Sequence, residues 1–369
     1  MKLITVNLRK KSYPIIIGSK ALSAINTKIR SMRLGKNAYI ITNAYLKNKY
    51  GSLLRNELIS CLNSVTFSLI PDSEKSKSLT IAYKLMRDIA YRYPKGDVFI
   101  VAFGGGVIGD LAGFVASIYK RGIPYIQIPT TLLAQVDSSI GGKTAVDLAC
   151  GKNLVGAFYQ PRLVASETFF LKTLSKRQIR SGLAEVLKYG IIHDAALFNF
   201  LEKEYNKVLA LNPKALEYIV TRSSAIKARI VEQDEFEQLG IRTKLNFGHT
   251  IGHAIEAAGG FKRYTHGEAI ALGMLIAADI SCAYGLITQE TAQRIERLMH
   301  RLELPTRLKN VAVSKIIAAH YHDKKFTGGK NRFVLLEKIG KTKTVTAVDL
   351  TVIRQAILKR TQPTSWSQS

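Results

Sequence analysis

The stretch Asp97-Val-Phe-Ile-Val-Ala-Phe103, followed at once by Gly104-Gly-Gly-Val-Ile-Gly-Asp110, decides the fold class of this chain. Its first part is an apolar run of strand length, and its second part leads into a helical run that extends through Ser117. The glycines at 104, 106 and 109 satisfy G-x-G-x-x-G between a strand and a helix, where the backbone can approach a pyrophosphate. The same pattern also occurs in tight turns without a ligand, and no acidic residue about twenty positions later supports the dinucleotide interpretation. The stretch therefore predicts an α/β unit, with nucleotide binding as a hypothesis.

Strand and helix signals alternate around this stretch, which favours a largely parallel sheet. Strand-like runs are Lys2 to Leu8, Ile15 to Ile17, Ala38 to Thr42, Val65 to Ile70 and Tyr125 to Ile128, and helix-like runs are Leu46 to Leu62 and Ser78 to Tyr91. Beyond about Pro161 the pattern changes to long helical runs, at Ser175 to Ile192, Ala215 to Gln233 and Ala269 to Tyr284, with one short strand at Arg332 to Glu337. We predict an α/β domain over residues 1–165 and a helical domain over residues 166–369.

Composition indicates a globular protein of the cytoplasm. The apolar share is 47% with 9 prolines, and the 3 cysteines lie far apart without a C-x-x-C pair, which favours a reducing compartment. The N-terminus alternates like a strand and has no apolar core of signal-peptide length. Glycines and Asp110 interrupt the apolar stretch Ile100 to Tyr119, so we expect no membrane helix.

The formal charge of +27, from 54 Lys and Arg against 27 Asp and Glu, raises the question of nucleic-acid binding. The basic residues are spread along most of the chain, with no arginine-rich tail and no zinc-finger spacing. An anionic substrate or a basic proteome explains such a dispersed excess as well. We therefore expect a small-molecule substrate and not a nucleic acid.

Three of the 7 histidines lie in the span Asn246 to Glu268. His249 and His253 are four apart and share a helix face, while His266 follows Gly259-Gly260 at the lead-in to another helix. Imidazole is a frequent zinc ligand, but a catalytic site usually has three protein ligands, often two His and a carboxylate. The spacing does not identify the third ligand, and ordinary helix and loop histidines remain the alternative.

A second glycine-rich run, Asp137-Ser-Ser-Ile-Gly-Gly-Lys-Thr144, is not a P-loop because Asp137 stands where that motif needs glycine. Lys143 and the nearby Gly151-Lys152-Asn153 suit an anionic group, and a pair of solvated loop lysines explains them equally well.

Four long motifs in order carry a family resemblance. They are Pro129-Thr-Thr-Leu-Leu-Ala-Gln-Val-Asp-Ser-Ser-Ile-Gly-Gly-Lys-Thr144, Gly182-Leu-Ala-Glu-Val-Leu-Lys-Tyr-Gly190, Leu245-Asn-Phe-Gly-His-Thr-Ile-Gly-His253 and His266-Gly-Glu-Ala. The chain resembles the 3-dehydroquinate synthases of the sugar-phosphate cyclase superfamily, from Ser12-Tyr-Pro to Ile339-Gly340. The resemblance implies a Rossmann-like N-terminal domain and an all-α C-terminal domain. It also implies a lyase of the shikimate pathway to chorismate and aromatic amino acids, with bound NAD, a divalent metal (zinc first, cobalt as alternative) and a homodimer.

The resemblance also implies roles for single residues. The metal ligands are Glu185, His249 and His266, so the missing ligand is a carboxylate. The substrate and proton-transfer residues are Lys188, Lys227, Arg242, Asn246 and His253. The residues for the substrate phosphate are Arg121, Lys143, Asn153, Lys324 and Lys325.

The NAD-binding residues implied by the resemblance lie in the first half of the chain. They are Asn43, Asp72, Glu74, Lys77, Gly104, Gly105, Gly106, Val107, Ile108, Gly109, Asp110, Thr130, Thr131, Asp137, Ser138, Lys143, Lys152, Phe170, Leu171, Lys172 and Thr173.

Three departures from the family pattern are visible. Asn43 stands where many members have Asp beside the adenosine ribose, Ser73 replaces a glycine, and the segment Asp234 to Gly240 is one residue longer. Two alternatives also remain: another sugar-phosphate cyclase of the same fold, or a basic nucleic-acid-binding protein with an inactive synthase fold.

Overall fold

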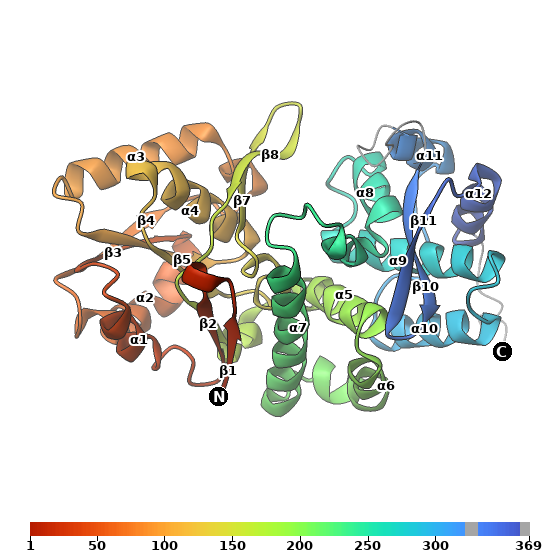
Figure 1. The fold of residues 1–369 in the computed structure, drawn as a ribbon, viewed down its shortest axis with the longest axis horizontal. Coiled ribbons are helices and arrows are strands. Elements are labelled where there is room, and N and C mark those ends of the chain that lie inside the picture. Colours follow the sequence, from red (N-terminus) through yellow and green to blue (C-terminus); the bar gives the residue numbers. More distant parts are fainter. Residues whose placement is uncertain (322–330, 362–369) are drawn as a thin grey trace. The chain divides into compact units, whose positions relative to one another are not determined.

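The computed structural model describes residues 1–321 and 331–361, and it divides into two compact units (Figure 1). Unit 1 consists of Met1–Ser175 and Pro213–Phe236, and unit 2 consists of Lys176–Asn212 and Glu237–Ser369. We expected a single domain boundary near residue 165. The two packed units instead have three boundaries along the chain, because the segment Pro213–Phe236 belongs to unit 1.

Unit 1 is an α/β domain built on one seven-stranded sheet, as predicted, with strand order β1-β2-β9-β6-β5-β3-β4. Only the edge pair β1 and β2 is antiparallel, and the other pairs are parallel. Its strands are β1 (Lys2–Val6), β2 (Tyr13–Gly18), β3 (Asn37–Thr42), β4 (Ser64–Leu69), β5 (Val98–Gly104), β6 (Tyr125–Pro129) and β9 (Val164–Glu167). Helices α1 (Ile25–Met32), α2 (Ala44–Ile59), α3 (Leu79–Arg92) and α4 (Gly106–Ile118) alternate with them, and β7 (Lys143–Leu148) pairs with β8 (Gly151–Phe158) in a separate hairpin.

The core of unit 1 fills both faces of this sheet. Ile40 and Val101 pack in one cluster with residues of α1 and α2, whereas their neighbours Ile41 and Ile100 pack in another with residues of α3 and α4. Successive side chains of a strand point to opposite faces, so a strand covered on both faces reads as a continuous apolar run. This explains why residues 98–103 are apolar throughout and fully buried.

Helix α7 (Pro213–Gln233) completes unit 1, although the sequence before it belongs to unit 2. It lies against β1 and β2. The carboxylate of Glu232 accepts hydrogen bonds from the backbone N–H (2.7 Å) and the side-chain amide (3.0 Å) of Asn7. The helical pattern of α7 is visible in the sequence, but the partner of its apolar face is not.

Unit 2 is predominantly helical, as predicted, with one added hairpin. Its helices are α5 (Lys176–Ile192), α6 (Ala195–Leu209), α8 (His249–Ala258), α9 (His266–Ala283), α10 (Gln289–Arg301), α11 (Val313–Tyr321) and α12 (Leu350–Lys359). The hairpin pairs β10 (Arg332–Lys338) with β11 (Lys341–Thr346), so the expected strand at 332–337 is confirmed.

Helix α9 lies at the centre of unit 2 and packs against α5, α8, α10, α12 and β10. Among the described residues it is the one helix long and apolar enough to cross a membrane, but 78% of it is buried inside the protein, as in a core helix. Its buried Asp279 accepts from the Nε of Arg360 at 2.6 Å, and Arg360 also pairs with Glu296 of α10 at 2.8 Å. These ion pairs fix the end of α12 against α9 and α10.

Candidate metal centre and active site

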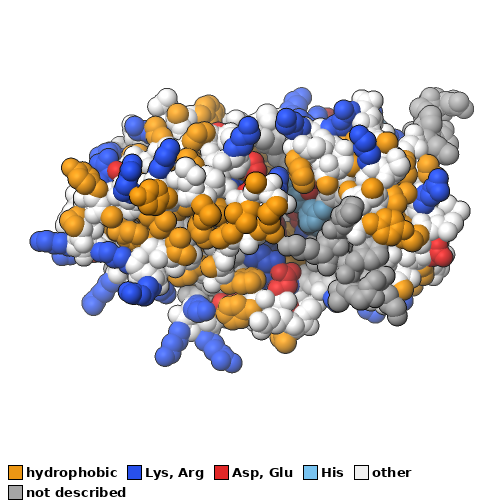
Figure 2. All heavy atoms as spheres, turned by 90° about the horizontal axis from the view of Figure 1, so that it is seen from above, with side chains coloured by type: hydrophobic (Ala, Val, Ile, Leu, Met, Phe, Trp, Pro, Cys, Tyr) orange, Lys and Arg blue, Asp and Glu red, His pale blue; other side chains and the backbone are white. Residues whose placement is uncertain are grey.

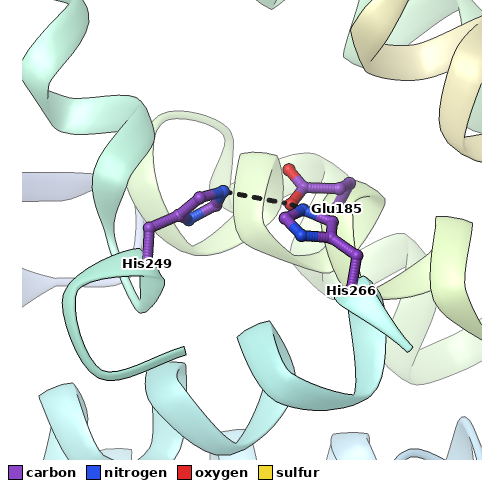
Figure 3. A group of neighbouring side chains, drawn as sticks. All are labelled: Glu185, His249 and His266. Atoms are coloured by element: carbon purple, nitrogen blue, oxygen red, sulfur yellow. Dashed lines mark ion pairs between the residues drawn. The ribbon is translucent and has the colours of Figure 1, made fainter. Parts of the chain in front are cut away.

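Glu185, His249 and His266 form a group whose possible ligand atoms all lie within 4.8 Å of one another (Figure 3). The Oε1 of Glu185 is 3.5 Å from the Nε2 of His249 and 3.3 Å from the Nε2 of His266. The three side chains come from three different helices, α5, α8 and α9, and Glu185 is fully buried. The structure thus brings together the three residues that the resemblance implied as ligands.

This donor set suits a divalent metal such as zinc. Two neutral imidazoles and one carboxylate are a common catalytic zinc set, and they leave a coordination position open. With metal–ligand bonds of about 2.1 Å, neighbouring ligand atoms of a tetrahedron lie about 3.4 Å apart. The separations of 3.3 and 3.5 Å lie close to that value.

The loop before α8 orients the ring of His249. Gly248 has φ 78°, and a Cβ there would lie 2.5 Å from the side chain of Met274 and 3.0 Å from the carbonyl of Ile270, so glycine is required for both reasons. The Nδ1 of His249 lies 3.2 Å from the carbonyl oxygen of Phe247. A proton on Nδ1 donated to that carbonyl leaves the lone pair of Nε2 directed to Glu185, as a metal ligand requires.

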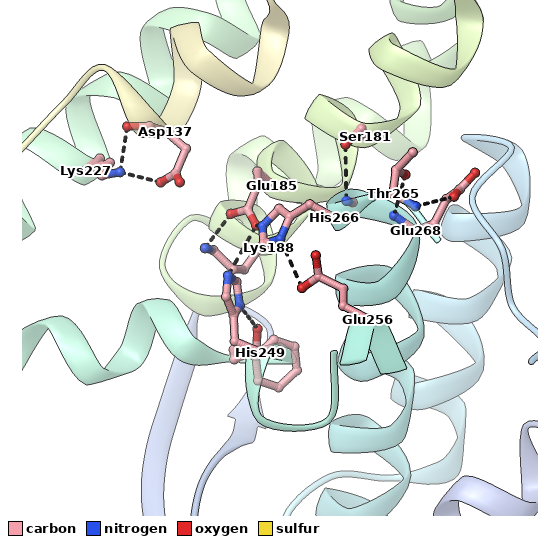
Figure 4. Close-up of polar contacts among 12 residues, drawn as sticks. Asp137, Ser181, Glu185, Lys188, Lys227, His249, Glu256, Thr265, His266 and Glu268 are labelled. Carbon is pink, nitrogen blue, oxygen red and sulfur yellow. Dashed lines mark hydrogen bonds and ion pairs between the residues drawn. The ribbon is translucent and has the colours of Figure 1, made fainter. Parts of the chain in front are cut away.

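A capping box begins α9 one residue before His266 (Figure 4). The hydroxyl of Thr265 accepts from the backbone N–H of Glu268 at 3.4 Å, and the carboxylate of Glu268 accepts from the backbone N–H of Thr265 at 2.7 Å. Arg177 of α5 donates to both oxygens of Glu268, at 2.9 and 2.7 Å. This arrangement fixes the point at which α9 begins, and hence the backbone of His266.

The same face of α5 holds the next residue of α9. The Oγ of Ser181 accepts from the backbone N–H of Gly267 at 3.1 Å, and a Cβ on Gly267 would lie 2.3 Å from the carbonyl oxygen of Ser181. Ser181 lies one helical turn before Glu185, so the two residues share a face. The close approach at Gly267 therefore brings His266 to Glu185.

Two pKa shifts describe the charge of this group in the absence of an ion. Burial lowers the pKa of His249 well below 6.5, and the Lys188 ammonium lowers it further. Burial also acts to lower the pKa of His266, but the carboxylates of Glu185 and Glu256 outweigh it and raise this pKa to about 10. The site thus attracts positive charge at His266, and a divalent cation would replace that proton.

The other predicted active-site residues of unit 2 lie on α5, α8 and the short helical segment Ile241–Asn246. Lys188 is 2% exposed and forms an ion pair with Glu185, and the ring of His253 lies 5.3 Å from that of His249 between centroids. Arg242 is also 2% exposed. Arg242 is the second residue and Asn246 the last residue of the segment Ile241–Asn246, which packs against α5. The roles of both residues stay predictions.

In unit 1 the glycine turn has the form expected of a phosphate-binding turn. Gly105 is the N-cap of α4 and provides no side-chain cap, and there is no acidic side chain in the first turn. A Cβ at Gly105 would lie 3.2 Å from Thr131, and one at Gly106 would lie 3.2 Å from the Oγ of Ser138. The N–H groups of this turn are not satisfied by a cap and suit an anionic group such as a pyrophosphate.

A cluster of charged residues around the buried Lys77 includes Asp110 of α4, the helix that begins at this turn. The Nζ of Lys77 donates to Asp110 at 2.8 Å and to the side-chain oxygen of Asn153, and it lies 3.6 Å from Glu74. Burial raises the pKa of Asp110 to about 6 despite Lys77, which leaves the carboxylate ionised at neutral pH. The structure therefore joins three predicted NAD residues to Asn153, which was predicted to contact the substrate phosphate.

A second contact in unit 1 joins α7 to the segment after β6. The Nζ of Lys227 lies 2.5 Å from the Oδ1 of Asp137 and 2.6 Å from its carbonyl oxygen. Lys227 was predicted to bind substrate and Asp137 to bind NAD, so the structure places a residue of each set in direct contact.

The remaining predicted residues are less closely grouped. Asn43 is the N-cap of α2, where its Oδ1 accepts from the N–H of Leu46 at 2.8 Å. Lys152 lies 3.9 Å from Glu74. Asp72 lies in a bend, and Arg121 ends the short 3-10 helical segment Tyr119–Arg121 at φ 64°. Thr130 comes directly after β6 and Lys143 begins β7, while the helical segment Thr168–Thr173 contains Phe170, Leu171, Lys172 and Thr173. Lys324 and Lys325 lie outside the described residues.

The positive charge is dispersed over the face that Figure 2 draws. Figure 2 shows Lys and Arg side chains scattered over the face that it draws, with a histidine visible among them. The described residues on that face form no continuous basic stripe of the kind typical of nucleic-acid binding.

Solved structures of similar fold carry cofactors. A 2-deoxy-scyllo-inosose synthase, solved with carbaglucose-6-phosphate, NAD+ and Co2+, is 26% identical with a TM-score of 0.89, and the match covers 97% of this chain and 100% of that one. A 2-epi-5-epi-valiolone synthase from Streptomyces hygroscopicus, solved with NAD+ and Zn2+, is 27% identical with a TM-score of 0.85, over 96% and 98% of the two chains. Together with the Glu–His–His group, this fold defines a synthase of the sugar-phosphate cyclase class.

Sequence relatives identify the family within that class. The family models of the 3-dehydroquinate synthase N-terminal and C-terminal domains match residues 67–181 and 182–326. A 3-dehydroquinate synthase from Desulforamulus reducens is 46% identical over 342 residues, which cover 92% of this chain and 95% of the relative. The chain belongs to the 3-dehydroquinate synthase family.

Sequence reasoning missed the residues that surround the ligands. Arg177 and Ser181 lie at one-turn intervals before Glu185, and Glu256 lies one turn after His253 and two turns after His249. This helical spacing was the available signal.

Proposed function

We propose that this chain converts 3-deoxy-D-arabino-heptulosonate 7-phosphate to 3-dehydroquinate and phosphate, as a carbon–oxygen lyase that needs NAD and a divalent metal, zinc or cobalt. The observation that carries the proposal is the Glu185, His249 and His266 group in a chain of this family. Both solved synthases described above contain NAD+ and a divalent metal, which supports the same requirement here.

Each bound group would supply one kind of chemistry. NAD would accept a hydride from a substrate carbinol and return it after the phosphate has left, and the metal would act as a Lewis acid on that carbinol oxygen. Glu185, His249 and His266 would hold the metal. The glycine turn, Asp110 and Lys77 would hold NAD.

The residues of unit 2 would bind and orient the substrate. Lys188 is buried and ion-paired with Glu185, so its ammonium group is positioned to donate hydrogen bonds to substrate oxygens beside the metal. Arg242 provides a planar donor group suited to the substrate carboxylate. His253 would move a proton to or from a substrate hydroxyl, while Asn246 would fix a further hydroxyl.

The cationic residues of unit 1 would meet the phosphate. Arg121, Lys143 and the amide of Asn153 suit a dianion, because charge-assisted hydrogen bonds to phosphate are strong. Asn153 already contacts Lys77, and Lys227 contacts Asp137. These contacts support a role of substrate binding next to the NAD residues. For the protein as a whole, we infer a cytoplasmic homodimer that acts on a sugar phosphate, with neither membrane nor nucleic acid as partner.

The second candidate function is that of another cyclase with the same fold, since the solved synthases named above are named for other products, an inosose and a valiolone. The test is an assay of the purified chain with heptulosonate phosphate, NAD and zinc. We expect phosphate release and dehydroquinate formation without net NADH, and no activity after chelation or in Glu185→Ala at any zinc concentration. If the chain turned over a hexose phosphate or another heptulose phosphate but not this substrate, the result would contradict the proposed function and support the second candidate.

A further inference from the structure

Glu256 lies on the side of His266 opposite Glu185 (Figure 4). Its Oε2 is 3.6 Å from the Nδ1 of His266, while the Nε2 of the same ring is 3.3 Å from Glu185. The side chain of Glu256 is 12% exposed. The ring of His266 is therefore bracketed by two carboxylates on two helices, α5 and α8.

The two ring nitrogens of His266 have different chemical roles in these contacts with Glu256 and Glu185. A neutral ring carries its proton on one nitrogen and a lone pair on the other, and only the lone pair can bind a metal. A carboxylate beside Nδ1 holds the proton there, which directs the lone pair of Nε2 away from Glu256 and toward Glu185. Carboxylate–histidine–metal arrangements also increase the basicity of the ligand nitrogen.

The Nδ1 atoms of His249 and His266 lie beside different kinds of group. The Nδ1 of His249 lies 3.2 Å from a neutral carbonyl, that of Phe247, whereas the Nδ1 of His266 faces a charged group. The ring of His266 is also the more exposed of the two, at 31% against 12%. The more exposed ring thus has the stronger orienting partner.

We propose that Glu256 is a positioning residue, which fixes the tautomer and ring orientation of His266 and thereby sets the affinity of the Glu185, His249 and His266 group for a divalent metal. This inference rests on the proposed function only in that the group binds a metal. Glu256 itself does not touch the metal or the substrate in this role.

The alternative for the same residues is a second metal position. His253, Glu256 and His266 also have ligand atoms within 4.8 Å of one another. His266 would then have to supply a different nitrogen to each of two ions, and its Nδ1 could no longer carry the proton. Metal stoichiometry distinguishes the two arrangements.

The experiment measures zinc binding to the full chain by competition with a chromophoric chelator, for wild type, Glu256→Ala, Glu256→Gln, Glu185→Ala and the control Glu290→Ala. Glu290 is an exposed glutamate in the first turn of α10. We expect one zinc per chain, a dissociation constant raised about 10–100-fold in Glu256→Ala, and a smaller rise in Glu256→Gln, which keeps an acceptor oxygen. Glu290→Ala should match wild type, and the visible spectrum of bound cobalt should change in Glu256→Ala.

Each other outcome has a distinct meaning. An unchanged zinc affinity in Glu256→Ala, or a fall from two zinc ions to one, would overturn the positioning role. The melting temperatures of metal-free wild type and metal-free Glu256→Ala should also be compared. A value well below wild type would overturn the positioning role, since the loss of zinc affinity would then come from a less stable helix. If wild type binds no zinc, the metal requirement of the proposed function fails, which is distinguishable because Glu185→Ala then equals wild type.

Discussion

Helices α9 and α5 contact each other closely at Gly267, so the variant Gly267→Ala should introduce a clash with the backbone of α5. An added Cβ would lie 2.3 Å from the carbonyl oxygen and 2.4 Å from the Cα of Ser181, whereas ordinary contact begins near 3.4 Å. Because both atoms belong to the backbone of a helix, no side chain can rotate away. The start of α9 must move by about 1 Å, and overpacking of this kind costs about 1–3 kcal/mol.

That movement would displace His266, the residue before Gly267, from Glu185. A misplacement of about 1 Å in an active site can reduce turnover about 10²-fold. We therefore expect Gly267→Ala to lower the melting temperature, to weaken zinc binding and to reduce the rate of phosphate release from heptulosonate phosphate by about that factor. Differential scanning calorimetry, chelator competition and a coupled phosphate assay measure the three effects.

Two further variants separate the causes. Ser181→Ala removes the acceptor of the Gly267 N–H without a clash, and it should cost about 1 kcal/mol with a smaller loss of zinc affinity. Gly285→Ala adds a Cβ at φ 66° with no heavy atom of the described chain within 4 Å, so it should cost about 1–2 kcal/mol in backbone strain and leave zinc affinity unchanged. Wild-type zinc affinity and turnover in Gly267→Ala would refute the reasoning.

Three other predictions follow from contacts outside the metal group. Arg360→Ala should lower the free energy of unfolding by about 3 kcal/mol in urea titrations, because it removes the guanidinium from the buried Asp279 and the half-buried Glu296. The loss stays at the lower end for a buried pair because Lys359 and Arg307 still meet these carboxylates, and Arg360→Lys should lie between. Burial acts to raise the pKa of Glu296, but Arg360 outweighs it and the folded pKa is lower than the ordinary 4.5, so its stabilising contribution is present above pH 4.5 and is lost as the pH falls through the folded value. Acid-unfolding curves of Glu296→Gln should be flatter in that window, and a curve parallel to wild type would contradict this. Asn43→Asp keeps an acceptor for the N-cap of α2, so its melting temperature should stay within a degree or so of wild type, while NAD titration should show tighter binding than wild type if the residue meets the ribose.

The sequence contained most of the fold because the main elements have strong local patterns. Residues 98–103 are apolar throughout, which requires cover on both faces of a strand, and β5 is indeed buried between two helical layers. The predicted helices at 175–192, 215–233 and 269–284 differ from α5, α7 and α9 by a few residues at their ends, where capping residues decide the boundary. The order of the four motifs also identified the family, and the two matching family models and the relative that is 46% identical confirm it.

The sequence alone also determined which residue types could bind a metal, since His249, His253 and His266 lie in one short span. It could not decide among them, because helical spacing puts His249 and His253 on one face and provides no carboxylate of known position. The resemblance to a family supplied Glu185, and the structure provides a physical reason: the glycine at 267 lets α9 approach α5 one turn from that carboxylate.

Only the tertiary structure decided the contacts between distant segments. Periodicity along a helix records that one face is buried, but the identity of the partner depends on how elements far apart in sequence pack together. For this reason α7 returns to the sheet of unit 1, and Glu256 meets the far side of the His266 ring. The sequence by itself determined the elements and the ligand types, and packing decided which side chains meet.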